Sequence, residues 1–189
     1  MPAIVTASQL RSILGVSVSL YSDAQLDSFI DSAEQTILPL LTQYQSSVTF
    51  ANVDNAVIYF TTIRPNYFVP GQSVIVTGAG TYNGTYTVTD DRIEPYTFTA
   101  ATAAADRTYP LPFIPAATAT LSGSSAAALY ANTPPIENAI LVVSVEIFQS
   151  ITAPGNQIMS DTFQPQPFIL GRSLTNRVIG LLGPFIDVE

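Results

Sequence analysis

The sequence predicts an α+β protein in which a small helical bundle, built from the N- and C-terminal segments, carries an inserted antiparallel β-barrel or sandwich domain. Apolar residues recur at three- and four-residue spacing at both ends of the 189-residue chain, whereas the middle alternates with a period of two. The composition, 47% hydrophobic and 11% charged, is typical of a folded protein. The predicted parts are a first helical segment (1–45), a β-domain (46–131), and a second helical segment with an extended arm and a C-terminal helix (132–189).

The first helical segment contains two predicted helices. Thr6 or Ser8 can cap a short helix, which Gly15 then ends. The stretch Ser22–Gln25 is a capping box that opens the next helix. One apolar stripe follows at helical spacing: Leu26, Phe29, Ile30, Ala33, Ile37, Leu40 and Leu41. Pro39 is expected to kink or end the last turn.

The β-domain is predicted from short runs of β-branched and aromatic residues between turn residues. The expected strands are Val48–Phe50, Val57–Thr61, Ser73–Thr77, Thr85–Thr89 and Tyr96–Thr99. A last strand over Ala117–Leu121 is followed by a return linker. Asn83-Gly84, between Tyr82 and Thr85, predicts a hairpin turn because both residues tolerate positive φ.

The second helical segment begins at Thr133-Pro134-Pro135, a cap followed by prolines at early helical positions. This helix is apolar on more than one face, which predicts either the centre of a bundle or a subunit contact. The stretch Phe163–Leu170 is expected to be an extended arm, because each X-Pro pair disfavours helix. Ser173 is expected to cap a final helix over Leu174–Leu182.

The composition excludes most familiar active sites. The chain has no Cys and no His, and all six basic residues are Arg. It therefore lacks thiolate nucleophiles, the usual general base, and lysine for Schiff-base or P-loop chemistry. The sequence predicts no enzyme, no cofactor and no metal site.

The net charge of −8 argues against tight electrostatic binding to nucleic acid or to anionic lipid. The N-terminus shows no secretory signal, and the best apolar run, Ala139–Val145, is too short to span a bilayer. The expected protein is soluble, is made in a cytoplasm and does not associate with a membrane.

Acidic and aromatic clusters have two interpretations each. Asp23, Asp27, Asp31 and Glu34 share one helix face. They can bind a divalent cation or form an acidic lining, but a solvated helix edge is favoured, because one helix rarely completes an oxygen cage. The tyrosines of the β-domain can stack on sugars or fill a small core; they are Tyr59, Tyr67, Tyr82, Tyr86 and Tyr96.

Two further motifs in the β-domain do not indicate a catalytic or nucleotide-binding site. Asp90 and Asp91 with Glu94 suggest paired carboxylates, but neighbouring strand residues face opposite ways, so a turn after Thr89 explains them better. Gly78-Ala79-Gly80 has the wrong spacing and context for a nucleotide-binding fingerprint.

The helix Ser22–Leu41, the helix Pro135–Ser150 and the C-terminal Val178-Ile179-Gly180-Leu181-Leu182-Gly183-Pro184-Phe185 together resemble the head–tail connector (adaptor) proteins of long-tailed bacteriophages. The resemblance covers residues 1–45 and 133–189. Gly71–Gly78 followed by Tyr82–Val88 resembles a small β-module of phage virion proteins, an insertion that family adaptors often lack.

The resemblance implies a structural, non-enzymatic virion protein at the head–tail junction, assembled in the host cytoplasm. It implies a homo-oligomeric ring, dodecameric in the family, that binds the portal protein and the next head–tail stopper or tail component. It also implies that double-stranded DNA passes through the ring without tight binding. The acidic residues Asp23, Asp27, Asp31 and Glu34 are lumen candidates.

The arm and final helix, residues 152–189, are expected to dock on the portal or on a neighbouring subunit. A segment folded back over its own bundle is the alternative. The expected interaction residues are Phe163, Pro165, Pro167, Phe168, Ile169, Leu170, Arg172, Arg177, Phe185 and Ile186. Other interpretations are a tail-completion or baseplate protein, and a carbohydrate-binding adhesin that uses its β-domain.

Overall fold

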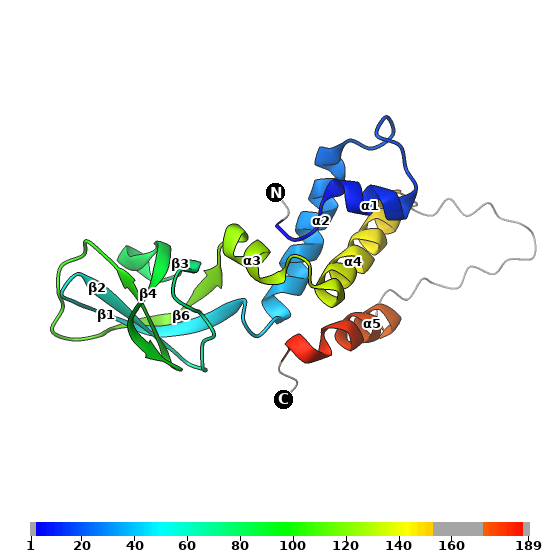
Figure 1. Cartoon of the computed structure of the whole chain (residues 1–189). Helices are drawn as coiled ribbons and strands as arrows, with labels where there is room; N and C mark the ends of the chain where they lie inside the picture. Colours follow the sequence, from blue (N-terminus) through cyan, green and yellow to red (C-terminus); the bar gives the residue numbers. More distant parts are fainter. Residues whose placement is uncertain (1–2, 153–171, 187–189) are drawn as a thin grey trace, which may run out of the picture. The chain divides into compact units, whose positions relative to one another are not determined.

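The computed structural model describes residues 3–152 and 172–186 (Figure 1). Over these residues the protein is α+β, with five α-helices and a closed six-stranded antiparallel barrel. This confirms the predicted class and makes the β-domain a barrel rather than a sandwich. The chain forms two compact units: Met1–Leu38 with Tyr130–Glu189, called the helical unit, and Pro39–Leu129, called the barrel unit.

Local capping starts the first two helices of the helical unit, as predicted. Helix α1 (Ala7–Leu14) begins with a capping box between Thr6 and Gln9, and Gly15 ends it at φ +66°. Helix α2 (Asp23–Ile37) begins with the Ser22–Gln25 capping box. Both boxes pair an N-cap hydroxyl and a glutamine side chain with backbone amides that would otherwise lack partners.

The predicted apolar stripe of α2 is largely confirmed. Its members Leu26, Ile30, Ala33 and Ile37 are buried. Leu40 is 51% exposed, because the α-helix gives way at Ile37 to the short 3-10 helix η1 (Leu38–Leu40). Changing from 3.6 to 3.0 residues per turn rotates Leu40 off the stripe, while Leu41, the last predicted member, is buried.

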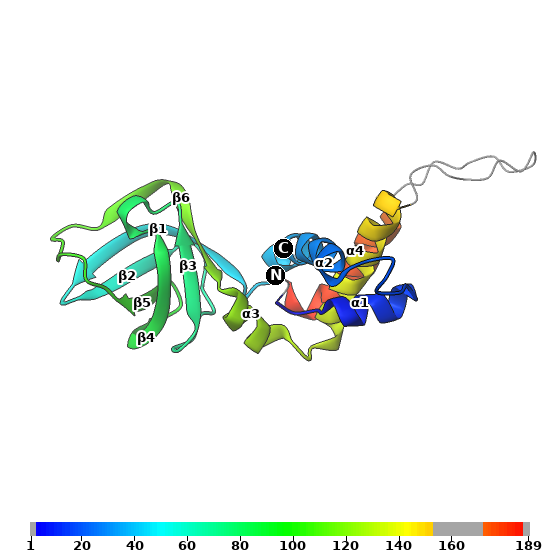
Figure 2. The same ribbon diagram turned by 90° about the horizontal axis from the view of Figure 1, so that it is seen from above.

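Helix α4 (Pro134–Thr152) is the most buried helix of this unit and contacts α1, α2 and α5 (Figures 1 and 2). The ring of Phe148 makes edge contacts with Tyr21 and Phe29, at centroid distances of 5.0 and 5.8 Å. Ser144 is fully buried and donates from Oγ to the Ile140 carbonyl at 2.8 Å. Contact with several helices explains why α4 is apolar on more than one face.

The final helix, α5 (Arg172–Leu182), starts before the predicted cap at Ser173, so Ser173 lies inside it. A 3-10 turn, η3 (Gly183–Phe185), follows. Val178 and Leu182 are buried, and α5 packs on α4.

Glu34 ties the N-terminal segment to α2. It is only 5% exposed, and its carboxylate accepts the amides of Ala3, Ile4 and Val5 at 2.8, 2.8 and 3.2 Å. The interpretation of Glu34 as part of a solvated helix edge is therefore wrong. A buried carboxylate is tolerable here because backbone donors replace its water.

The barrel unit closes in the order β1-β2-β5-β4-β3-β6, with every neighbouring pair antiparallel (Figure 2). The strands are β1 (Gln45–Asp54), β2 (Val57–Thr62), β3 (Ser73–Thr77), β4 (Gly84–Glu94), β5 (Thr97–Ala101) and β6 (Leu111–Leu121). Each contains a strand predicted from sequence or nearly coincides with one. The barrel interior holds alternate side chains, including Val48, Ile58, Phe60, Val74, Val76, Val88 and Phe98.

The predicted Asn83-Gly84 turn is wrong. Asn83 is extended at φ −65°, and Gly84 already belongs to β4. The chain reverses earlier, through Gly78 at φ +79° and Gly80 at φ +61°, with the short helix η2 (Gly80–Tyr82) between the strands. Asn83 instead accepts the Ala79 amide on Oδ1 at 2.7 Å, which holds this longer loop together.

Two other elements were not predicted. A two-residue turn at Asn55-Ala56, with φ of 51° and 61°, joins β1 to β2, although alanine rarely adopts positive φ. Residues assigned to a return linker form helix α3 (Gly123–Tyr130), where Ser122 Oγ accepts the Ser125 amide and alanines favour helix. The turn expected after Thr89 is also wrong, since β4 continues to Glu94.

We expect Glu34→Ala to lower the free energy of unfolding by about 2–4 kcal/mol, because two buried amides and one partly buried amide lose a carboxylate acceptor. Urea unfolding followed by circular dichroism measures this. Gln35→Ala, at an exposed position of the same helix, is the matched control and should change stability by no more than about 0.5 kcal/mol. Equal stability of the two variants would contradict the role assigned to Glu34.

Candidate binding groove on the barrel

The loop between β2 and β3, residues 63–72, is fastened at both ends to the strands that it crosses. Near its start, the backbone amide and the Nδ2 of Asn66 both donate to the Pro95 carbonyl, at 2.6 and 2.9 Å. Near its end, the Gly71 amide donates to the Val88 carbonyl at 2.9 Å. The loop therefore lies along β4 and β5 instead of extending into solvent.

Strand β4 bulges beside this loop. Thr89 pairs with Thr99, but the next pair in register is Glu94 with Thr97. Residues 90–93 of β4 thus stand opposite a single residue of β5. Because extra residues on one strand have no ladder partners, they bend that strand away from its neighbour.

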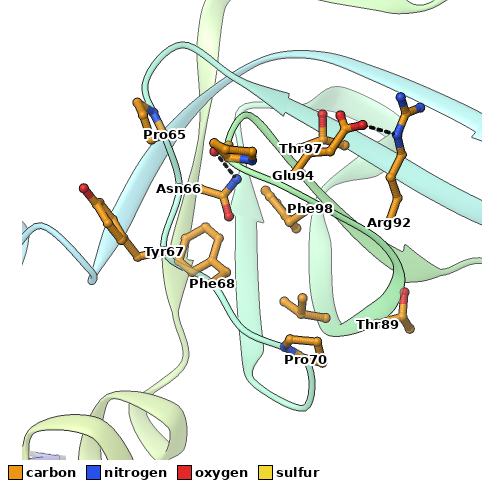
Figure 3. Close-up of a pocket in the computed structure, with 12 residues that line it drawn as sticks. Pro65, Asn66, Tyr67, Phe68, Pro70, Thr89, Arg92, Glu94, Thr97 and Phe98 are labelled. Carbon is orange, nitrogen blue, oxygen red and sulfur yellow. Dashed lines mark hydrogen bonds and ion pairs between the residues drawn. The ribbon is translucent and has the colours of Figure 1, made fainter.

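A groove of about 330 Å³ lies between the loop and the bulge (Figure 3). Its lining residues are Pro65, Asn66, Tyr67, Phe68, Pro70, Val88, Thr89, Arg92, Glu94, Pro95, Thr97 and Phe98. Figure 3 shows Phe68 and Phe98 at its centre, Tyr67 on one side and Arg92 on the other. Its volume is at the small end of the range of roughly 300–1,000 Å³ for ligand pockets.

The groove floor is part of the barrel core. Phe98 stacks on Phe60 with centroids 5.0 Å apart, and Phe68 meets Phe98 edge-on at 5.2 Å. Tyr86 contacts Phe60 on its other side and donates its hydroxyl to the Tyr82 carbonyl at 3.0 Å. Burial, and to a lesser extent the neighbouring Tyr82, raise the pKa of Tyr86 above its ordinary value of 10.0. Because these rings pack against one another, the floor of the groove is apolar.

The rim supplies exposed and polar groups. The ring of Tyr67 is 46% exposed, whereas Phe98 beneath it is 2% exposed. Arg92 Nε contacts Glu94 Oε1 at 2.7 Å, and both side chains remain about half exposed. Such a pair contributes little to stability, because water solvates both charges well. The groove can therefore bind a ligand through apolar contact and a few rim hydrogen bonds.

The carboxylates of Asp90, Asp91 and Glu94 do not converge in the groove. Asp90 and Asp91 are exposed in the bulge and do not line it, while Glu94 does. Within the described residues, no group of three or more acidic side chains could hold a metal ion. None of the helices described is both long and apolar enough to cross a membrane.

The predicted interaction residues fall in three places. Phe163, Pro165, Pro167, Phe168, Ile169 and Leu170 lie outside the described residues. Arg172 begins α5, Arg177 is exposed on that helix, and Phe185 and Ile186 are partly exposed after it. The structure does not bring these residues to the groove.

The acidic candidates on α2 are not equivalent. Asp23 is ion-paired with Arg11 at 2.6 Å, and Arg11 also donates to the Tyr21 carbonyl at 3.0 Å. Asp27 and Asp31 are partly exposed, whereas Glu34 is buried. Of these four residues, Asp23, Asp27 and Asp31 can present charge at the surface of the single chain, and Glu34 cannot.

A second surface lies at one end of the helical unit, where the α1–α2 loop meets the last turns of α4 (Figures 1 and 2). We call it the apolar end surface and define it by Ile13, Val18, Leu20 and Ile151, which are 57%, 65%, 68% and 56% exposed. The Tyr21–Phe148 contact joins the loop to α4. Several large exposed aliphatic side chains in one unit suit a surface that another chain covers.

The groove was not predicted from the sequence. Tyr67 was predicted as a possible stacking residue, but the loop that holds it was not predicted. The available signal was Pro65-Asn66-Tyr67-Phe68-Val69-Pro70, two aromatic residues bracketed by prolines. Such a stretch favours an extended, rigid loop.

The chain matches no protein-family model and no curated protein sequence. The fold and the groove therefore define its class only as an α+β protein with a groove-bearing six-stranded antiparallel barrel.

We expect Phe98→Ala to destabilise the barrel by about 3–5 kcal/mol, because it removes a buried ring that packs against two others. Tyr67→Ala should cost no more than about 1 kcal/mol, since that ring is 46% exposed. Urea unfolding measures both variants. A large loss in Tyr67→Ala would show that the rim is structural.

Proposed function

We propose that this protein is a structural, non-enzymatic subunit of a bacteriophage virion, forming a ring at the head–tail junction. The ring links the portal protein to the next head–tail stopper or tail component. Its subunit number is twelve by resemblance to the adaptor family. The chain is assembled into the virion in the host cytoplasm.

The apolar end surface is the observation that carries this proposal. Val18 and Leu20 are more than three-fifths exposed in the loop after α1, and Ile151 on α4 is 56% exposed. Burying a large aliphatic side chain stabilises an assembly by roughly 1.5–3 kcal/mol. In a ring of identical subunits, every copy gains this contact.

In this proposal α1, α2, α4 and α5 form the adaptor bundle, and the barrel is an insertion in it. Packing of α4 on α1, α2 and α5 supports the bundle. The bundle forms the ring wall, while the exposed Arg177 and the segment ending at Ile186 are placed against the portal or a neighbour.

The charge of the chain suits a DNA conduit. A net charge of −8 with no lysine gives a wall that does not hold phosphates, so a moving duplex is not retarded. Asp27 and Asp31 are partly exposed and are the acidic residues of α2 that we place toward the lumen. Glu34 has a structural role instead.

Carbohydrate binding by the barrel is the second candidate, and the exposed ring of Tyr67 in the groove favours it. An adhesin would bind glycans without forming a closed ring. Glycan-array binding by the intact chain, together with a monomeric mass, would support this alternative. A tail-completion or baseplate role would instead appear as ring formation without binding to the portal.

We expect the double variant Val18→Asp/Leu20→Asp to remain folded but to lose ring formation, because the two carboxylates added at each subunit contact cannot be desolvated cheaply. Mass photometry and negative-stain imaging of the purified chain measure this. Ile114→Asp, the same kind of change at a 93% exposed position of the barrel, is the control and should leave the ring intact.

The opposite pattern would contradict the proposal. If the wild-type chain stays monomeric when a candidate portal is present, the proposed ring is contradicted. Rings that persist in Val18→Asp/Leu20→Asp but break in Ile114→Asp would place the subunit contact on the barrel.

A further inference from the structure

The residues that line the groove carry more hydrogen-bond donors than the fold uses. Within the described residues, the amides of Tyr67 and Phe68 donate no hydrogen bond. The guanidinium of Arg92 has five N–H donors, and only its Nε is engaged by Glu94. The floor between these donors is apolar. The groove therefore fits a ligand with much apolar surface and with hydrogen-bond acceptors, but few donors.

An extended proline-containing peptide has this chemistry. Proline contributes a carbonyl acceptor but no N–H, and its fixed φ lowers the entropy lost on binding. Grooves lined by aromatic residues are the usual receptors for such peptides. The chain itself contains such a stretch in Phe163-Gln164-Pro165-Gln166-Pro167-Phe168, with two X-Pro pairs, two aromatic rings and no charge.

We propose that the groove of one copy binds residues 163–168 of a neighbouring copy. This inference rests on the proposed function only in assuming that copies lie side by side. The phenylalanines and prolines of the segment pack on the floor formed by Phe68 and Phe98. Tyr67 covers the peptide from the rim, and Arg92 donates to its carbonyl groups.

The length of chain permits this contact. Residues 163–168 lie outside the described residues, between the end of α4 at Thr152 and the start of α5 at Arg172. At roughly 3.3 Å per extended residue, Phe168 can be up to about 13 Å from Arg172, and Phe163 up to about 30 Å. A helix with its side chains is about 10–12 Å wide, so Phe163 can lie more than one helix width from the start of α5.

Charge also favours this occupant over a sugar. Each copy carries a net charge of −8, so a contact between copies is least opposed when it is neutral, as this segment is. Sugars need several polar partners. In the groove the single carboxylate, Glu94, is already paired with Arg92, and Asn66 Nδ2 is engaged by the Pro95 carbonyl.

Disulfide trapping tests the contact, since the chain has no cysteine of its own. One full-length chain carries Thr97→Cys in the groove, and a second, distinguished by a size tag, carries Gln166→Cys between the two prolines. Thr85→Cys, at an exposed position of the same barrel, replaces Thr97→Cys in the control. We expect the mixed dimer to form at least about fivefold more than in the control on mild oxidation.

Each outcome decides the proposal. Mixed dimers no more abundant than in the control overturn docking in the groove. A Thr97→Cys/Gln166→Cys double variant that closes only within one chain, at any concentration, overturns the assignment to a neighbour. The trapping measures contact between free copies, whereas portal binding measures the virion role, so either can fail while the other holds.

Peptide binding provides a second test. A fluorescent synthetic peptide of residues 161–170 is titrated into the full chain carrying Pro165→Ser/Pro167→Ser, whose own segment then competes poorly. We expect Tyr67→Ala to weaken binding at least about fivefold, Tyr67→Phe to restore it, and Tyr109→Ala, at a 77% exposed tyrosine elsewhere on the barrel, to leave it unchanged. Binding that is absent, or that soluble glycans displace, overturns the proposal.

Discussion

Pairing of β1 with β6 is the constraint on which the barrel depends. These strands are the first and last of the sheet, and their ladder, which includes Gln45 with Thr120, closes the sheet on itself. The Leu121 amide also donates to the Tyr44 carbonyl at 2.9 Å. Closure removes the exposed sheet edges. It also brings the two ends of the domain together, so a barrel can be inserted between α2 and α4 at one point of the chain.

The groove follows from a mismatch inside that closed sheet. Strand β4 has 11 residues and its neighbour β5 has 5, so part of β4 cannot pair with β5. The excess appears as the bulge at residues 90–93, and the β2–β3 loop covers the open side. A site that depends on one strand being longer than its partner cannot be assigned before the pairing is known.

Local signals predicted the fold well where the stabilising contacts are short in sequence. The Thr6 and Ser22 caps each act on a residue three positions away, so they were correctly assigned from the chain alone. Asn83-Gly84 has a strong turn signal, yet β3–β4 pairing and the loop around η2 place the reversal at Gly78–Tyr82. The strand Ser73–Thr77 was predicted with its observed bounds, but β1, β4 and β6 were predicted too short, because pairing with neighbouring strands extends beyond the β-favouring core of each.

The sequence by itself determined the α+β class, the starts of α1, α2 and α4, and the absence of histidine, cysteine and lysine. Only the tertiary structure decided that Glu34 is a buried anchor, because its partners lie 29 to 31 residues away. It likewise decided that Tyr67 and Arg92, which come from a loop and a bulge, line the same groove. Contacts within one helical turn can be predicted from residue identity, but contacts across a closed sheet depend on strand order and register.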